Sequence, residues 1–325
     1  MKLLRRQLLE SALATVTTSV LFRPASALNY PIKPVRVIVP FAAGGSTDIA
    51  ARLISHWLSE RLGQQFFIEN RPGGGANIGA DLVAHAPADG YTLLILAVTN
   101  AINATLYEKL NFNLIEDISP IASIARTPLV MEVNSPFPAR TVSEFIAYAK
   151  ENPGKINMAS SGTGTTTHLA GELFKMMTGV SMVHVPYRGD ALAITDLLSG
   201  QVQVYFGGLA AAMEQIRAGR LRALAVGTAT RLERLPNVPT LAETLSGYEA
   251  SSWVGVGAPK ATPADIIDKL NKEINASLAD SSIITRLAEL GLTVLPGSPA
   301  DFRKLIADDT AKWAKVVRVS GVKPE

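Results

Sequence analysis

Two short loops, rich in glycine and hydroxyl side chains, are the segments of this chain whose composition best suits an anion-binding site. The first is Pro40-Phe41-Ala42-Ala43-Gly44-Gly45-Ser46-Thr47-Asp48, and the second is Ser160-Ser161-Gly162-Thr163-Gly164-Thr165-Thr166-Thr167-His168. Each follows a strand-like segment and precedes a segment with helical spacing. Free N–H groups and the dipole at a helix start favour a negative group, and glycine lets the backbone approach a ligand closely.

The first loop does not match a nucleotide-binding loop. It has neither the lysine of a P-loop nor the glycine spacing of a dinucleotide fingerprint. Phe41, Gly44 and Gly45 would bring backbone to the ligand, and Thr47 could add a hydroxyl donor. Asp48 either contributes to the site or caps the following helix. An ordinary strand–helix turn remains the alternative for the whole loop.

The second loop offers hydroxyl groups that could hold a carboxylate directly or through water, from Ser161, Thr163 and Thr165 around Gly162. His168 falls in the first turns of the predicted helix, where it is either a ligand contact or a capping and packing residue. The two loops belong to different halves of the chain. We therefore predict a pocket between two domains, with a helix N terminus on each side.

Two further segments carry charge beside glycine. Arg71 precedes Gly73-Gly74-Gly75 and offers paired donors, but it could instead pair with a nearby acid. In Pro186-Tyr187-Arg188-Gly189, Tyr187 could stack on an organic ligand or face the core, and Arg188 is either a ligand contact or a surface charge.

Patterns for catalysis and for metal binding are missing from the sequence. None of the four histidines has a metal-binding spacing, no G-x-S-x-G elbow occurs, and there is no cysteine. Ser161 and His168 lie too close in sequence to indicate a triad by themselves, and no acid completes one. We therefore expect no enzyme activity, no cofactor and no metal.

Strand-like and helix-like segments alternate around these loops. Short β-branched or continuously apolar runs predict strands at 35–39, 66–69, 92–98, 129–133, 156–159, 182–185, 202–206 and 221–226. Helical spacing or start signals predict helices at 49–62, at 166–177, and from Thr141, Thr262-Pro263 and Ser298-Pro299 onward. This alternation indicates parallel sheets covered on both faces. The Pro-containing tracts 134–140 and 236–258 are candidates for crossings between two domains.

The N-terminal segment has the layout of a cleaved export signal. Cationic residues, among them Arg5 and Arg6, come first, 11–22 is uncharged and mildly apolar, and Ala25-Ser26-Ala27 is an A-x-A processing site. The uncharged run is too short to cross a bilayer. Arg5-Arg6 resembles a twin-arginine signal, but the Sec route remains open. The alternative is a first helix of the fold, which Pro24 would interrupt.

Removal of this signal changes the charge argument. The full chain has a formal charge of +3, and the charged residues before Ala27 account for all of it. The remaining chain is near neutral, so its composition gives no sign of a nucleic-acid binder. Without a cysteine there is no lipid anchor at the new N terminus, and we expect a monomer without a direct membrane anchor.

A series of motifs resembles the receptors of tripartite tricarboxylate transporters, often called the Bug family. In order these are P-F-A-A-G-G-S-T-D (40–48), E-N-R-P-G-G-G (69–75), S-G-T-G-T-T-T-H-L-A-G-E-L-F (161–174), V-P-Y-R-G (185–189), D-L-L-S-G-Q-V (196–202), L-P-N-V-P-T-L-A-E (235–243) and A-P-K-A-T-P (258–263). The resemblance covers essentially all of the chain after the signal. Single motifs are weak, but the ordered series is specific.

The resemblance implies an α/β periplasmic binding protein of the Venus-flytrap type, similar to type II, with a hinge between two mixed sheets flanked by helices. It implies domain 1 at 28–128 plus 252–325 and domain 2 at 129–251, after a signal at 1–27. It also implies that the two loops hold a small carboxylate, partly through water, and that cargo passes to membrane permease subunits.

The family pattern also gives the residues of the site. It places Phe41, Gly44, Gly45, Thr47 and Asp48 on one side of the ligand, and Ser161, Gly162, Thr163 and Thr165 on the other. Arg188 stands where the family usually has lysine, and since the two cations are not interchangeable, its contact is in doubt. Two other functions stay open: a carboxylate-sensing partner of a periplasmic sensor domain, and a periplasmic hydrolase or transferase that uses Ser161 or His168.

Overall fold

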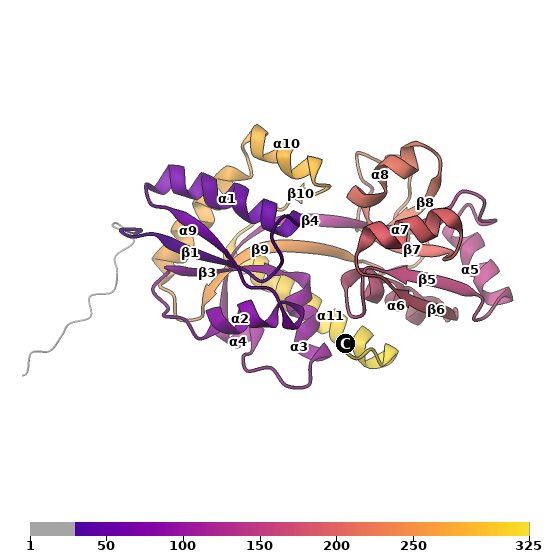
Figure 1. The fold of residues 1–325 in the computed structure, drawn as a ribbon, viewed down its shortest axis with the longest axis horizontal. Helices are drawn as coiled ribbons and strands as arrows, with labels where there is room; N and C mark the ends of the chain where they lie inside the picture. The colour runs from indigo at the N-terminus through magenta and orange to yellow at the C-terminus, as the bar shows by residue number, and fades with distance from the viewer. Residues whose placement is uncertain (1–29, 325) are drawn as a thin grey trace, which may run out of the picture.

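The computed structural model describes residues 30–324, which form two α/β lobes side by side (Figure 1). The predicted export signal at 1–27 lies outside the described residues. Within residues 30–324, no helix combines the length and the apolar character needed to span a membrane.

The first lobe is built on a mixed sheet with the strand order β2-β1-β3-β9-β4. Its strands are β1 (Val35–Val39), β2 (Phe66–Asn70), β3 (Thr92–Ala97), β9 (Ser251–Pro259) and the first half of β4 (Ile118–Asn134), with the short β10 (Thr293–Val294) on β4. Its helices are α1 (Ser46–Leu62), α2 (Asn77–Ala84), α3 (Val98–Leu106), α4 (Leu114–Asp117), α9 (Ala264–Ser277) and α10 (Ser281–Glu289).

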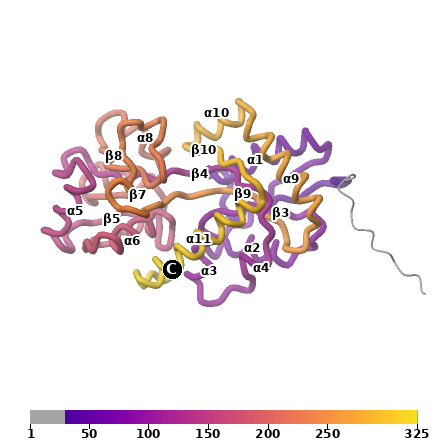
Figure 2. The backbone as a smooth tube through the Cα atoms, turned by 180° about the vertical axis from the view of Figure 1, so that it is seen from behind, coloured from indigo at the N-terminus to yellow at the C-terminus, as the bar shows by residue number. Residues whose placement is uncertain are grey.

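The second lobe has the strand order β4-β7-β5-β6, with β8 on the other side of β4. Its strands are the second half of β4, β5 (Ile156–Ser160), β6 (Met182–Pro186), β7 (Val204–Gly208) and β8 (Leu221–Val226). Its helices are α5 (Val142–Glu151), α6 (Thr166–Thr178), α7 (Asp190–Ser199) and α8 (Leu209–Arg217). The long α11 (Pro299–Ser320) packs against α3 and α6, and thus against both lobes (Figure 2).

Strand β4 is shared between the two sheets. It pairs with β9 as far as Pro128 and with β7 from Leu129 onward. The chain returns to the first lobe at β9. Immediately before β9, the Ala250 amide still donates to the Gly227 carbonyl of the second lobe. One cluster of buried apolar side chains continues through both lobes, from Leu94 in β3 to Phe206 in β7.

The directions of the strands make the two candidate loops face each other. Strands β1 and β3 run parallel to β4, because β9 is antiparallel to both β3 and β4. Their carboxyl ends therefore point toward the second lobe. Strands β5, β6 and β7 run opposite to β4, so their carboxyl ends point back toward the first lobe.

Most predicted elements are present. The first half of β4 and the strand β9 are among the elements that were not predicted, and three further expectations differ from the structure. The mixed sheets implied by the resemblance are confirmed, whereas uniformly parallel sheets were the wrong expectation from alternation alone. The tract 134–140 is not a crossing: the Arg222 guanidinium binds the Phe137 carbonyl at 2.9 Å within the second lobe. Helix α9 begins one residue later than predicted, with Pro263 at its N-cap, so Thr262 does not cap it.

Candidate functional site

Both loops lie at topological switch points of their sheets. In the first lobe, β1 leads through α1 to β2 on one side, while β3 pairs with β1 on the other. In the second lobe, β5 leads through α6 to β6, while β7 pairs with β5 on the other side. Open α/β sheets bind ligands at such positions, outside the carboxyl ends of the strands. The sheet order therefore places the candidate site where the β1–α1 and β5–α6 loops face each other (Figure 1).

The N terminus of α1 is open to a ligand. Its N-cap is Gly45, and no side chain accepts a hydrogen bond from the first turn. Within residues 30–324, the amides of Ser46, Thr47 and Asp48 have no hydrogen-bond partner. Exposed backbone from Ala42 to Ser46 surrounds them. This end of a 17-residue helix therefore presents three free N–H donors and the positive end of its dipole.

The conformation of the first loop depends on Asp48. This side chain is 1% exposed and accepts hydrogen bonds from the Gly44 amide (2.9 Å), the Asn70 amide group (2.8 Å) and the Arg52 guanidinium (2.9 Å). Burial alone would raise the pKa of Asp48, but these hydrogen bonds outweigh it and hold the pKa below its usual value. Asp48 therefore fixes the conformation of the loop from its buried side, and its carboxylate is already hydrogen-bonded within the protein.

Gly44 and Gly45 differ in their conformational needs. Gly44 has φ +86°, where other residues are strained, so the turn requires glycine there. Gly45 has φ −75° and ψ 164°, which any residue adopts, and a Cβ there would lie 3.9 Å from the Ala42 carbonyl oxygen. A side chain at Gly45 would thus fit, and its absence keeps the helix end uncapped.

The second loop, in contrast, satisfies most of its own donors. The Ser161 amide bonds to the Thr167 hydroxyl at 2.9 Å, and the Gly162 amide bonds to Ser160 Oγ at 3.2 Å. The Thr165 hydroxyl caps α6 and also bonds to the Gly162 carbonyl at 2.6 Å. Toward the first lobe, this loop presents mainly half-buried side chains. One of them is Thr163, whose hydroxyl bonds to no described residue. The two loops are therefore not equivalent anion sites.

His168 orders the second loop from behind. It is 4% exposed, its Nδ1 accepts the Gly164 amide at 3.1 Å, and its Nε2 lies 3.6 Å from Glu172 Oε1. Its ring stacks on His184, with centroids 3.5 Å apart. Burial alone would raise the pKa of Glu172, but the hydrogen bonds from His168 and Lys175 lower it. Both ring nitrogens of His168 are thus engaged within the protein.

The structure does not bring Ser161 and His168 together as a nucleophile and base. The Ser161 hydroxyl lies 2.9 Å from the Thr167 hydroxyl instead. A different pair is in contact: Ser160 Oγ lies 2.6 Å from His184 Nε2, but Ser160 is 0% exposed. A substrate would not reach that hydroxyl.

The N terminus of α7 lies beside the second loop. The Tyr187 amide bonds to the Ser160 carbonyl at 2.9 Å, which extends the pairing of β5 with β6. The Tyr187 hydroxyl donates to Asp196 at 2.7 Å, and burial together with this bond raises the pKa of Tyr187 to about 12. Arg188 is exposed and forms no ion pair within residues 30–324. The Tyr187 side chain thus faces α7, while Arg188 is free to turn toward a ligand.

Three polar residues of the second lobe were missed by the sequence analysis. Tyr205 in β7 donates a hydrogen bond to Asp190, the first residue of α7. Glu132, its cross-strand neighbour in β4, is 0% exposed. The sequence signal that could have revealed Glu132 is an acidic residue within the otherwise apolar run 129–133.

In the first lobe, Asn100 was also missed. It follows β3 at the switch point, and its Oδ1 accepts the Ala97 amide at 3.0 Å. Its Nδ2 is buried and has no hydrogen-bond partner within the described part of the chain. Arg71, in contrast, is not free, because it pairs with Glu69.

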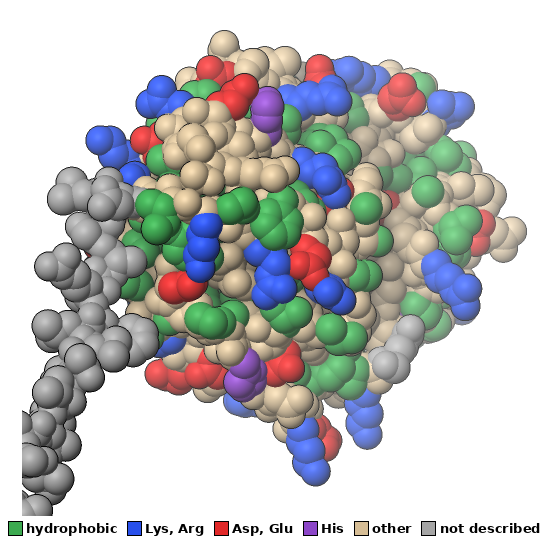
Figure 3. All heavy atoms as spheres, turned by 60° about the vertical axis from the view of Figure 1, so that its left-hand side comes forward, with side chains coloured by type: hydrophobic (Ala, Val, Ile, Leu, Met, Phe, Trp, Pro, Cys, Tyr) green, Lys and Arg blue, Asp and Glu red, His purple; other side chains and the backbone are tan. Residues whose placement is uncertain are grey.

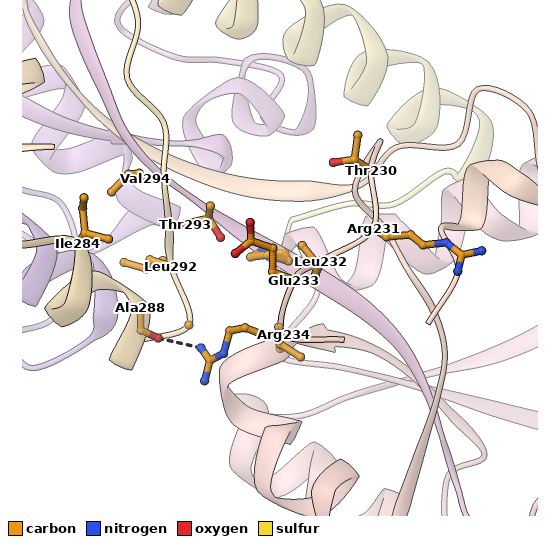
Figure 4. Close-up of a pocket in the computed structure, with 13 residues that line it drawn as sticks. Thr230, Arg231, Leu232, Glu233, Arg234, Ile284, Ala288, Leu292, Thr293 and Val294 are labelled. Carbon is orange, nitrogen blue, oxygen red and sulfur yellow. Dashed lines mark hydrogen bonds between the residues drawn. The ribbon is translucent and has the colours of Figure 1, made fainter. Parts of the chain in front are cut away.

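A cavity of about 420 Å³ lies elsewhere between the lobes, under the segment 230–234 on one side and α10 and β10 on the other (Figure 4). It is lined mainly by apolar side chains, and Arg234 closes one end by donating to the Ala288 carbonyl at 2.9 Å. None of the predicted site residues lines it. Of the two cations in its lining, Arg231 pairs with Glu243 and Arg234 donates to the Ala288 carbonyl, whereas the β1–α1 loop presents three free amides at a helix N terminus.

Two further kinds of site, for metals and for nucleic acids, depend on clusters of charged side chains. No group of three or more His, Cys, Asp or Glu side chains within residues 30–324 is arranged to hold a metal ion. On the face in Figure 3, cationic and anionic side chains are interspersed and form no basic stripe.

Comparison with known proteins gives a consistent result. The model of the tripartite tricarboxylate transporter family receptor matches residues 50–322. Protein BugT of Bordetella pertussis is 38% identical over 313 residues, which is 95% of this chain and 95% of that protein.

Two similar solved structures contain carboxylates. The R. palustris protein Rpa4515 with adipate is 39% identical, with a TM-score of 0.77 over 91% of this chain and 100% of that chain. MatC from Rhodopseudomonas palustris with bound malate is 32% identical, with a TM-score of 0.73 over 89% of this chain and 100% of that chain.

Proposed function

Since the chain belongs to the tripartite tricarboxylate transporter receptor family, we propose that it is a periplasmic solute-binding receptor that captures a small organic carboxylate between its lobes without catalysis. The observation that carries this proposal is the uncapped N terminus of α1 at a switch point that faces the second lobe. The adipate and malate in the similar structures support a carboxylate ligand.

The ligand carboxylate accepts hydrogen bonds from the free amides of Ser46 and Thr47 at the N terminus of α1. Gly44 and Gly45 keep the space above these amides clear, and Phe41 and the Thr47 hydroxyl border it. Asp48 positions the loop and does not contact the ligand. In the second lobe, Ser161, Thr163 and Arg188 contact the other end of the ligand, while Thr165, Gly162 and His168 keep that loop in shape.

Binding is coupled to a hinge motion. The chain passes from the first sheet to the second after Pro128 of β4, and it returns to the first sheet at Ser251, the first residue of β9. A ligand that touches both lobes favours the closed arrangement over the open one. Gly164 already packs against Leu106 of α3, since a Cβ on Gly164 would lie 2.6 Å from that side chain. The second loop therefore meets the first lobe directly at this edge.

The cargo is handed to membrane permease subunits of a tripartite transporter, and the export signal at 1–27 delivers the receptor to the periplasm. Signalling to a periplasmic sensor domain remains compatible with this function. A hydrolase or transferase is disfavoured, because the Ser–His contact involves the fully buried Ser160.

A thermal-shift screen of the chain without residues 1–27 against small carboxylates tests the proposal. A ligand at one hundred times its dissociation constant adds about 2.7 kcal/mol to the free energy of unfolding, and ester and amide derivatives in the same screen should yield no product. If no carboxylate raises the melting temperature, the proposed function is wrong. Release of product would assign an enzyme instead.

A further inference from the structure

Two imidazole rings are stacked behind the second loop. His168, in the first turn of α6, is 4% exposed, and its ring lies on that of His184 in β6, with centroids 3.5 Å apart and an angle of 6° between the ring planes. His184 is half-buried, and its Nε2 lies 2.6 Å from Ser160 Oγ. Histidine changes its charge more readily than other side chains between pH 5 and 8. The second-lobe side of the site is therefore supported by two titratable rings.

The hydrogen bonds of His168 require a neutral ring. Its Nδ1 lies 3.1 Å from the Gly164 amide nitrogen, which is a donor, so Nδ1 accepts and carries no proton. The single ring proton is therefore on Nε2, which lies 3.6 Å from Glu172 Oε1. Gly164 has φ +75°, in the left-handed region, and the bond from its amide to the ring fixes this turn of the loop. The loop conformation thus depends on the protonation state of one ring.

A proton on Nδ1 would favour a different arrangement. The Nδ1–H and the Gly164 N–H would then be two donors facing each other, so their hydrogen bond would be lost and the loop would have to move. On the other side of the ring, Glu172 favours the charged form. Burial would raise the pKa of Glu172, but its hydrogen bonds to His168 and Lys175 lower the pKa below its usual value, so this acid is ionised. An anion beside Nε2 therefore makes a protonated His168 attainable despite its burial.

The other elements packed against α6 place one titratable ring on His168. Strand β5 (Ile156–Ser160) has no titratable side chain, Tyr205 of β7 donates to the acid at the start of α7, and Tyr248 donates to a main-chain carbonyl of α6. The residues of α11 that share a pocket with Glu172 are uncharged: Val316, Val319 and Ser320. Among the described residues, the titratable group of another element that touches the ring is His184. Because the two rings are stacked, a charge on one opposes a charge on the other.

We infer that the His168–His184 pair is a pH-sensitive switch for ligand binding, in which a proton on His168 breaks its bond to the Gly164 amide and releases the second loop. This inference rests on the proposed function, in which Ser161 and Thr163 of this loop contact the ligand. Gly164 also joins the loop to the first lobe, because it packs against Leu106 of α3. Affinity should therefore be full while His168 is neutral and should fall below roughly pH 6.5, around which histidine side chains usually titrate.

Three variants separate a switch from a purely structural role, which would give no dependence on pH. In His168→Asn, the Oδ1 atom can take the place of Nδ1 and accept the Gly164 amide, but it does not titrate. Glu172→Gln keeps an acceptor for the Nε2–H and removes the negative charge, so it should shift the loss of affinity to lower pH. His85→Gln is the control, since His85 is exposed at the C-cap of α2 in the first lobe.

The test has two readouts on the same protein as in the thermal-shift screen. Nitrogen-15 NMR of the imidazoles between about pH 5.5 and about pH 8 reports the tautomer and protonation of each histidine, together with the shift of the Gly164 amide. Calorimetry gives the dissociation constants of malate and adipate between about pH 6 and about pH 8, where carboxylic acids are mainly ionised.

We expect His168 to be the neutral Nε2–H tautomer at the upper end of this range and to become protonated on acidification, with the Gly164 amide shifting at the same midpoint. Loss of the hydrogen bond to Gly164 should raise the dissociation constant by about 3-fold to 10-fold. His168→Asn should abolish this rise, Glu172→Gln should move it to lower pH, and His85→Gln should keep it.

The outcomes separate the switch from the function on which it rests. The switch is wrong, and the receptor proposal stands, if His168 stays neutral throughout, if the proton goes to His184 alone, or if the Gly164 amide does not follow His168. A His168→Asn protein with the wild-type pH dependence also overturns the switch, and if that variant does not fold, an unshifted curve in Glu172→Gln overturns it instead. If neither acid binds at any pH and the wider carboxylate screen is also negative, the receptor proposal itself fails, while the NMR titration still decides whether His168 moves the loop.

Discussion

Gly45→Asp should abolish carboxylate binding while leaving the fold intact. Gly45 is the N-cap of α1, with φ −75° and ψ 164°, the extended conformation that capping aspartates adopt. A Cβ there has only the Ala42 carbonyl oxygen nearby, at 3.9 Å, so it fits. The new carboxylate would accept the free amides of the first helical turn in place of the ligand.

The size of the effect follows from these contacts. Replacing glycine by aspartate at an N-cap changes stability by only a few tenths of a kcal/mol. Loss of two hydrogen bonds to a charged ligand costs about 3–6 kcal/mol, or roughly 10²-fold to 10⁴-fold in affinity. Stability and binding should therefore separate in one variant.

The assay combines urea denaturation with calorimetric titration of the carboxylate that the thermal-shift screen identifies. Gly45→Ala is the matched control, since it has the same backbone but adds no acceptor, and its loss of affinity should be much smaller. A Gly45→Asp protein that is folded and binds with wild-type affinity would refute the assignment of the carboxylate to the N terminus of α1.

Three further predictions concern the residues around the site. Thr163→Val, which removes a hydroxyl that bonds to no described residue, should weaken ligand binding less than Gly45→Asp does in the same titration, and an equal loss would mean that the second loop carries the carboxylate. Asp48→Asn should lower the free energy of unfolding by about 2–3 kcal/mol at neutral pH. Because the pKa of Asp48 is lowered in the folded protein, the difference from wild type should shrink below about pH 4. A difference that stays constant in pH-dependent denaturation would contradict the hydrogen bonds assigned to the Asp48 carboxylate. The pKa of Glu132 is raised in the folded protein. The free energy of unfolding of the wild type should therefore fall by up to about 1.4 kcal/mol per pH unit relative to Glu132→Gln as pH rises above about 4.3. If the stabilities of the two proteins change in parallel with pH, Glu132 is ionised in the folded protein.

The sequence predicted the two loops and their flanking elements because their signals are local. A buried β-branched run before a glycine-rich turn gives β1 and its loop, and hydroxyl residues at a helix start give the α6 cap. The first half of β4 was not predicted, because Ser119, Pro120 and Arg126 interrupt its apolar run, and its burial comes from pairing with β9.

The roles within the loops could not be predicted in the same way. Whether a loop amide is free or bonded depends on the loop conformation, which Asp48 sets in the first loop and His168 in the second. The pairing of Glu132 with Tyr205 depends on the β4–β7 register, which joins segments far apart in the sequence. The two loops have similar compositions. Only the hydrogen bonds in the structure show that backbone amides are free at the first loop and bonded within the protein in the second.

A crystal structure of the receptor with its carboxylate ligand tests the central claim most directly. We predict carboxylate oxygens within about 3 Å of the Ser46 and Thr47 amide nitrogens, as expected for charged hydrogen bonds, with the rest of the ligand directed toward Ser161 and Arg188. A ligand seated instead in the cavity beneath Arg234, or one whose carboxylate lies on the second lobe alone, would contradict the account.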